Sequence, residues 1–277
     1  SKEVKRSFTA DELKIGDYFY SDGTWSDGGL RKIYTDGSMK IAAEKPAPML
    51  TNPNTGAERK VVGIVFQTDK SRIGAKEKEK LGAGNVHGLV IAVKNVATDQ
   101  KWGPYGQNEG LTKCNTKADN YKDISGYGNC EHIRTGRGNF DSHPAFKAAD
   151  DYNTICKVPG TTTGWYLPAS GQWWDILQNL GGCPALADTG QQGATDNDFS
   201  WSGQGNVLAV LNAWMEKIAA DSKNDFSRAN VFWSSSEESG RHAWYWYVGS
   251  DSCVSCHCFR KAVSYTHLRA HETGAYL

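Results

Sequence analysis

The chain lacks several features that would assign it to a common class of protein. Its 31 Lys and Arg residues are balanced by 31 Asp and Glu residues, so it has neither a basic footprint for nucleic acid nor a polybasic patch for a membrane. No apolar run approaches the roughly 20 residues that cross a bilayer. GxSxG, HExxH and P-loop motifs are absent from the sequence as well. We therefore predict that the chain is not an enzyme and that it needs no cofactor or metal.

One segment also lacks four residue types. Residues 239–260, SGRHAWYWYVGSDSCVSCHCFR, contain no Lys, Glu, Gln or Met, although these types fill 44 of the other 255 positions. Every residue of the segment except Trp244 and Trp246 can be encoded by a codon of any two bases followed by C, a set that excludes Lys, Glu, Gln, Met and Trp. Adenine-directed mutagenesis of AAC codons produces this residue set. We interpret residues 239–260, called the diversified segment below, as a binding surface that is varied for its own sake.

Motifs on both sides of the diversified segment carry a family resemblance. They are LKIGDYFYSDGTW at 13–25, GWYLP at 164–168, QW at 172–173, FWSSSE at 232–237 and AW at 243–244. Together they resemble the variable proteins of diversity-generating retroelements from gut Bacteroides-type bacteria, over roughly residues 11–263. The resemblance implies an α+β, C-type-lectin-like fold, shared with the formylglycine-generating enzymes. It also implies that C-terminal strands and loops display the mutable residues.

Strand alternation divides residues 242–248 into two faces. Trp244, Trp246 and Val248 are large and apolar, and we expect them in the core. Ala243, Tyr245 and Tyr247 share the opposite face, which we expect to meet solvent. Tyrosine presents rigid, amphipathic contact area at low entropic cost, as it does in antibody paratopes, so this face favours binding over an ordinary half-buried strand.

The predicted ligand contacts all lie in the diversified segment. Tyr and Phe would supply buried area, and Arg241 and Asp251 would supply charge-assisted hydrogen bonds. The expected partner is a macromolecule, either a protein or a surface glycan, because such a patch is broad rather than deep. The predicted contact residues are Ser239, Arg241, His242, Tyr245, Tyr247, Ser250, Asp251, Ser252, Cys253, Ser255, Cys256, His257, Cys258 and Phe259.

Two further functions compete with this interpretation. The first is a surface adhesin or pilus-tip component, for which diversity would be incidental. The second is a cysteine-dependent oxidase of the formylglycine-generating type, for which Cys256 and Cys258 are the candidates. Thiol alkylation separates the two classes, because it would abolish an oxidase and only perturb a binding protein.

The seven cysteines leave the redox compartment open. Cys114, Cys130, Cys156 and Cys183 would form two disulfides in an oxidising compartment or remain buried thiols. The Cys253-x-x-Cys256 pair with His257 superficially offers soft metal ligands. No second CxxC completes a zinc site, however, and a redox CxxC would begin a helix, so random placement of cysteine is the preferred explanation. The Asp196-Asn197-Asp198 triplet would suit Ca²⁺ but is more often a solvated turn.

Periodicity predicts one α+β domain over residues 1–263, with short antiparallel strands, about three helices and long loops. The expected strands are 17–20, 61–66, 88–93, 231–235, 242–248 and 258–263. The expected helices begin at Ser142, with Pro144 in the first turn, at Ser170, with Gly181-Gly182 as the stop, and at about Asn206, running to Ala220. Residues 69–85 and 101–140 are expected to be irregular loops.

Both ends of the chain differ from a typical mature domain. Residues 264–277, beginning SYTHLRAHET, resemble a translated sequencing adapter, so we predict a non-native tail without an evolved packing partner. That origin also outweighs a zinc interpretation of His267 and His271. The first residue is not Met, so we expect a missing leading segment, and membrane attachment only through an anchor in it. Extracellular or cell-surface location is the resulting expectation.

Overall fold

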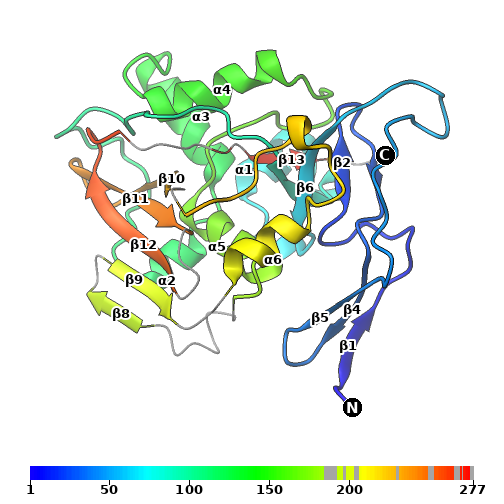
Figure 1. Ribbon diagram of the computed structural model, residues 1–277. Coiled ribbons are helices and arrows are strands. Elements are labelled where there is room, and N and C mark those ends of the chain that lie inside the picture. The colour runs from blue at the N-terminus through cyan, green and yellow to red at the C-terminus, as the bar shows by residue number, and fades with distance from the viewer. Residues whose placement is uncertain are drawn as a thin grey trace.

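The fold is mixed α+β, with three antiparallel sheets and six α-helices among the residues described (Figure 1). No helix in these residues combines the length and apolar character needed to span a bilayer. The computed structural model describes residues 1–183, 192–195, 198–202, 206–228, 231–248, 253–264, 269 and 271–274.

The first five-stranded sheet is built on the most apolar stretches of the chain. β6 (Val61–Gln67) and β7 (Gly88–Ala92) are buried along their whole length. β6 pairs with β2 (Tyr18–Tyr20), which in turn pairs with β3 (Trp25–Ser26). These strands are buried on both faces and are rich in β-branched residues, so they read as continuous apolar runs. This explains why sequence analysis located β2, β6 and β7 correctly, whereas it did not predict β3.

The second five-stranded sheet carries the diversified segment. Its strand order is β10–β11–β12–β9–β8, all antiparallel. In Figure 1 this sheet lies at the left of the molecule, away from the first sheet. The diversified segment supplies the two adjacent strands β11 and β12. The strand bounds are β10 Val231–Glu237, β11 His242–Tyr247, β12 Cys253–Arg260, β9 Asp198–Ser202 and β8 Gln192–Thr195.

A small third sheet forms the N-terminal end of the molecule. It consists of β1 (Val4–Ser7), β4 (Leu30–Tyr34) and β5 (Met39–Ile41), with β4 in the middle. It projects beside the N-terminus at the lower right of Figure 1. β1 is exposed along its whole length. Leu30 of β4 belongs to the larger hydrophobic cluster, and Ile33, Met39 and Ile41 pack against that cluster.

The helices gather between and above the two larger sheets. α4 begins with Pro144 at its first position, where a missing N–H costs little, and His143 rather than Ser142 is the N-cap. α5 begins at Ser170, one residue after its N-cap Ala169. The helices are α1 Ala75–Leu81, α2 Lys117–Lys122, α3 Gly126–Arg137, α4 Pro144–Ile155, α5 Ser170–Asn179 and α6 Val207–Ala213, with 3₁₀ turns at Lys70–Arg72, Ala83–Asn85 and Ala220–Ser222.

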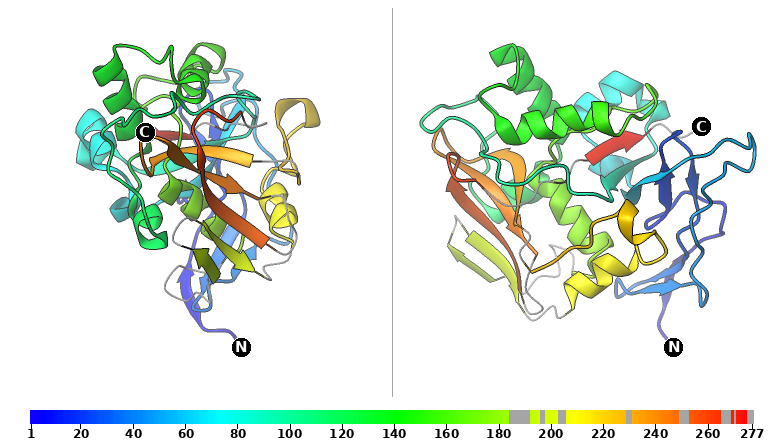
Figure 2. Two further views of the ribbon diagram at one scale, coloured as in Figure 1. Left: turned by 90° about the vertical axis from the view of Figure 1, so that its left-hand side faces the viewer. Right: turned by 45° about the horizontal axis from the view of Figure 1, so that its top comes forward.

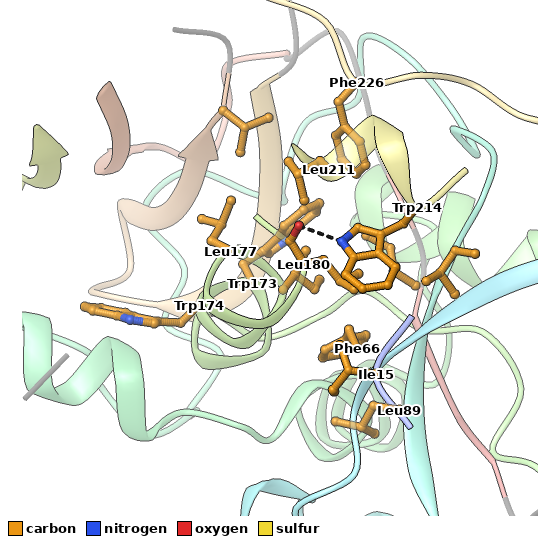
Figure 3. Close-up of a cluster of buried hydrophobic side chains, with 14 of the residues drawn as sticks. Ile15, Phe66, Leu89, Trp173, Trp174, Leu177, Leu180, Leu211, Trp214 and Phe226 are labelled. Atoms are coloured by element: carbon orange, nitrogen blue, oxygen red, sulfur yellow. Dashed lines mark hydrogen bonds between the residues drawn. The ribbon is translucent and has the colours of Figure 1, made fainter. Parts of the chain in front are cut away.

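α5 forms the centre of the larger hydrophobic cluster. Its Trp173 and Trp174 are fully buried between β6–β7 on one side and β10–β11 on the other. Trp214, which follows α6, packs into the same cluster and donates its indole N–H to the Leu180 carbonyl at 2.9 Å (Figure 3). The helix predicted to begin at Ser170 is therefore confirmed, and it joins the two larger sheets.

A second hydrophobic cluster lies under α3 and α4. It brings Phe146 and Ile133 from these helices against Val65 and Val90 of the first sheet. Trp233 of β10 belongs to it as well. The two clusters together cover both faces of β6 and β7. Figure 2 shows α3 and α4 above the sheets when the top of the molecule is brought forward.

Two predicted loops contain helices. Residues 69–85 include α1, whose sequence AKEKEKL buries only Glu77. Residues 101–140 include α2 and α3, and α3 holds three glycines and buries only Cys130 and Ile133 as apolar side chains. Weak apolar periodicity hides such helices from sequence analysis, because tertiary packing rather than intrinsic propensity holds them. The third predicted helix is shorter than expected: α6 ends at Ala213 instead of continuing to Ala220. Its Val210 is 41% exposed.

The segment His271–Gly274 forms strand β13, which pairs with β7 in antiparallel register. Arg269 is almost fully buried and donates to the carbonyls of Asn224 and Ala92 while it lies over the Phe226 ring. Burial lowers the pKa of Arg269 to about 9. The expectation that these residues lack a packing partner is therefore wrong, because a sheet edge accepts any extended backbone. A non-native origin for residues 264–277 stays a prediction.

Candidate binding surface

The predicted core face of β11 is confirmed. Trp244, Trp246 and Val248 are all 0% exposed. The Trp244 indole donates to the Cys114 carbonyl, and the Trp246 indole donates to Ser170 Oγ, both at 2.9 Å. These two bonds fix β11 to segments far away in the sequence. The inward face of the diversified segment is therefore tied into the fold.

The opposite face of β11 and β12 carries a row of aromatic and polar side chains, which we call the aromatic face: Tyr245, Tyr247, Ser255, His257 and Phe259. The pairing register sets Tyr245 opposite His257, and Tyr247 opposite Ser255. The Tyr245 and His257 rings are stacked, with centroids 5.2 Å apart and planes at 28°. Phe259 meets Tyr245 edge-on and is 41% exposed. Rigid rings held in this way offer contact area with little entropy left to lose.

The aromatic face is exposed only in part. Ala243 was expected to meet solvent but is fully buried, because it packs beside Trp233 in the second hydrophobic cluster. Tyr245 packs partly against the same cluster, with its ring edge-on to Trp233. Ser255 is 7% exposed, and its hydroxyl lies 2.7 Å from His257 Nε2. The accessible part of the face therefore centres on Tyr247, His257 and Phe259.

The turn that joins β10 to β11 presents three more predicted contacts. Arg241 is exposed, and its guanidinium lies 5.9 Å from the Tyr105 ring centroid. Ser239 Oγ accepts hydrogen bonds from the amides of Arg241 and His242, each at 3.2 Å. Ser250, Asp251 and Ser252 lie outside the described residues, as do Asp196 and Asn197 of the predicted Ca²⁺ triplet.

The cysteines of the diversified segment do not act as one group. Cys256 is fully buried beside Ser170, so it cannot contact a ligand as predicted. Cys253 is the first residue of β12, and its side chain lies outside the described part of the structure. Among the described residues, no disulfide joins Cys114, Cys130, Cys156, Cys183, Cys256 or Cys258.

A buried charge cluster, which sequence analysis did not predict, anchors the diversified segment. Glu237, at the end of β10, is 0% exposed and accepts from Lys261 Nζ at 2.6 Å, from Lys113 Nζ, and from the Glu109 amide at 2.9 Å. Burial lowers the pKa of Lys261, and the bond to Glu237 opposes that shift. The cluster ties the end of β12 and the 105–114 loop to one carboxylate.

The serines of the FWSSSE motif are also structural. Ser234 Oγ donates to the Trp244 carbonyl at 2.8 Å, and Ser236 Oγ donates to Asp123 Oδ2 at 2.6 Å. Ser235 Oγ accepts from Asn129 Nδ2 at 3.0 Å. All three are fully buried, so their hydroxyls satisfy polar groups that would otherwise be stranded in the interior. The motif fixes the strand beside the candidate surface.

A third group is suited to metal binding. Glu238, His242 and Cys258 bring one carboxylate oxygen, one imidazole nitrogen and one thiol sulfur within 4.8 Å of one another. Sequence analysis named His242 and Cys258 as ligand contacts but did not name Glu238.

No family model and no curated protein matches the chain. Among solved structures, a fimbrial protein from Bacteroides ovatus ATCC 8483 is similar, with a TM-score of 0.57 and 20% sequence identity. The match covers 95% of this chain and 49% of that protein, so the chain spans about half of its length. At this identity the match establishes a shared fold. The expected C-type-lectin-like topology is a finer assignment and stays a proposal.

Proposed function

We propose that the chain is an adhesin or tip component of a bacterial surface fibre. The observation that carries the proposal is the match to a fimbrial protein along nearly the whole chain. The partly exposed aromatic face is consistent with it, because an adhesin needs a rigid patch that meets another surface. Its ligand would be a protein or a surface glycan at the bacterial exterior.

Cell fractionation of the source organism tests this location. An antibody raised against the chain should label intact cells as strongly as permeabilised ones, and mechanical shearing should release the antigen with surface fibres. Labelling that appears only after permeabilisation would contradict the proposal.

Ligand binding by the aromatic face can be tested separately. We expect a variant with Tyr247→Ala, His257→Ala and Phe259→Ala to lose binding on an array of glycans and host-surface proteins. The matched control is Lys76→Ala with Glu79→Ala, an exposed ion pair on α1. Equal binding by both variants would place the ligand site elsewhere.

A retroelement-diversified surface is the second candidate function. It is supported by the residue set of the diversified segment together with the burial of its two tryptophans, whose TGG codons contain no adenine. The source locus should hold a reverse-transcriptase gene and a template copy of the region for residues 236–263. The two copies should differ only at template adenines. A complete locus without a template would leave the first proposal standing and remove this one.

A further inference from the structure

Three side chains of complementary chemistry meet beside the first residue of β11, on the side of the sheet that carries Trp244 and opposite the aromatic face. The ligand atoms of Glu238, His242 and Cys258 all lie within 4.8 Å of one another, and each residue is half-buried. His242 Nδ1 lies 3.5 Å from Glu238 Oε2. A carboxylate, an imidazole and a thiol are thus gathered at one point from two separate parts of the chain.

The backbone holds this arrangement in place. The amides of Glu238 and Ser239 both donate to the His242 carbonyl, at 3.0 and 3.1 Å, so the turn between β10 and β11 is tightly closed. On β12, Cys258 pairs with Trp244, which makes it the diagonal neighbour of His242 on the same face of the sheet. Ligands that are fixed by hydrogen-bonded backbone lose little freedom when they bind an ion.

We propose that Glu238, His242 and Cys258 form a binding site for a divalent transition metal of the zinc class. Thiolate and imidazole select zinc-like ions, whereas Mg²⁺ and Ca²⁺ require oxygen ligands throughout. Zinc ligands at about 2.0–2.3 Å from the ion lie roughly 3.3–3.8 Å from one another in a tetrahedron. The Glu238–His242 distance already has this value. Side-chain rotation of Cys258 and Glu238 closes the remaining separations.

The fourth coordination position has room for a water molecule. A cavity of about 430 Å³ adjoins the site and is lined by His242, Cys258, Phe259, Arg260 and Val263. Three protein ligands plus a water is a common zinc arrangement. Carboxylate and thiolate together neutralise the charge of the ion. Arg260 carries the opposing charge in the same cavity, and its exposed side chain can turn toward solvent.

This site differs from the CxxC that the sequence presents. Cys258 is the cysteine that reaches it, and its two partners come from the β10–β11 turn rather than from β12. The proposal also stands apart from the fibre and diversification proposals, since a metal site here requires neither.

Zinc titration of the intact chain tests the site. With a non-chelating phosphine reductant present, competition with a chromogenic chelator should show one Zn²⁺ per chain with micromolar or tighter affinity. The affinity should fall as the pH drops and protons compete for the imidazole and the thiolate. Co²⁺ in place of Zn²⁺ should give a thiolate-to-cobalt charge-transfer band and the intense visible bands of tetrahedral coordination. Ca²⁺ and Mg²⁺ should not compete.

Variants locate the ion. Cys258→Ser, His242→Ala and Glu238→Gln should each weaken zinc binding at least about 10-fold, because loss of even an outer-shell partner costs 10- to 100-fold. Cys156→Ser, which removes a half-buried thiol elsewhere, should bind as the wild type does. Arg260→Gln should tighten binding roughly twofold to tenfold by removing a repelling charge. Circular dichroism and melting curves show whether each variant is folded.

His242→Ala decides the case if Cys258→Ser fails to fold, because His242 is the partly exposed first residue of β11. Absence of stoichiometric zinc binding would overturn the proposal. Equal zinc affinity in His242→Ala and the wild type would do the same, as would a Co²⁺ spectrum without a thiolate band.

Discussion

At the scale of single residues, the side chains of β11 alternate between the core face of the sheet and the opposite, aromatic face. We predict that Trp244→Ala lowers the free energy of unfolding by roughly 3–5 kcal/mol, because it empties a fully buried aromatic site and strands the Cys114 carbonyl. Tyr247→Ala on the opposite face should cost about 0.5 kcal/mol or little more. Urea denaturation measures both values. Similar losses for the two variants would contradict the division into faces.

Glu77 is a buried carboxylate with few hydrogen bonds to offset its loss of hydration. One of its oxygens has no hydrogen-bond partner, and the other accepts from the Tyr127 amide at 3.3 Å. Burial raises the pKa of Glu77 to about 7. A group whose folded-state pKa is raised stabilises the fold below its unfolded pKa of about 4.5, and that stabilisation is lost as the pH rises through about 7.

We therefore expect Glu77→Gln to raise stability by roughly 1–3 kcal/mol at pH 8 and to have little effect below pH 4.5. Melting curves across this pH range measure the difference. Glu79→Gln on the exposed side of α1 serves as the control and should behave as the wild type does throughout. A Glu77→Gln effect that is independent of pH would show that Glu77 does not titrate in this range.

At the scale of elements, the Glu237 cluster joins β10, the end of β12 and the 105–114 loop. Glu237→Gln would leave Lys261 buried without a balancing charge, and breaking such a buried pair typically costs about 3–5 kcal/mol. We also expect faster hydrogen exchange at the Cys114 and Trp102 amides, which bond to Glu237 and Lys261 carbonyls. Glu44→Gln, an exposed substitution, is the control. Unchanged exchange in the loop would show that Glu237 does not hold it.

The elements that sequence analysis located share strong local patterns. β6, β7 and α5 have continuous apolar runs or a clear helical stripe, and the core face of β11 followed from alternation alone. α1 and α3 were missed because their sequences are polar or glycine-rich and their helical state depends on neighbours. β13 was missed for a different reason. Strand pairing uses backbone groups, so a sheet edge such as that of β7 accepts a partner whose side chains give no signal.

The candidate site divides in the same way. Tyr245 and Tyr247 lie on one face of β11, as alternation predicts. His257 and Phe259 join them through the pairing of β12 with β11, which sequence analysis did not predict. Cys256 was misassigned because composition alone does not reveal which face a residue occupies. Glu237 meets Lys113 and Lys261, and the Glu238–His242 pair meets Cys258, from other segments of the chain. Without an alignment, sequence analysis has no means of pairing residues across such distances.

At the scale of the whole molecule, the six cysteines described form no disulfide, so the fold is built with reduced thiols. Burial raises the pKa of the Cys114 and Cys130 thiols, and that of Cys183 to about 12, which keeps them protonated and unreactive. We expect a reductant to leave the melting temperature unchanged. The buried thiols described should react with a thiol reagent only after unfolding. The half-buried thiols of Cys156 and Cys258 should react in the folded protein, but more slowly than the thiol of a small molecule in solution. A melting temperature that falls on reduction would reveal a disulfide.

The indole of Trp102 bonds to the Ser234 carbonyl, that of Trp244 to the Cys114 carbonyl, and Lys261 Nζ to the Gln107 carbonyl. The partners in these bonds are 132, 130 and 154 residues apart. Contacts of such long range make folding slow, because the chain must close large loops before any contact offsets the lost entropy. During synthesis the 101–114 segment must wait for more than half of the remaining chain to emerge. The diversified segment is thus among the last parts of the molecule to assemble. Until then its tryptophans are exposed, and the chain can aggregate or bind a chaperone.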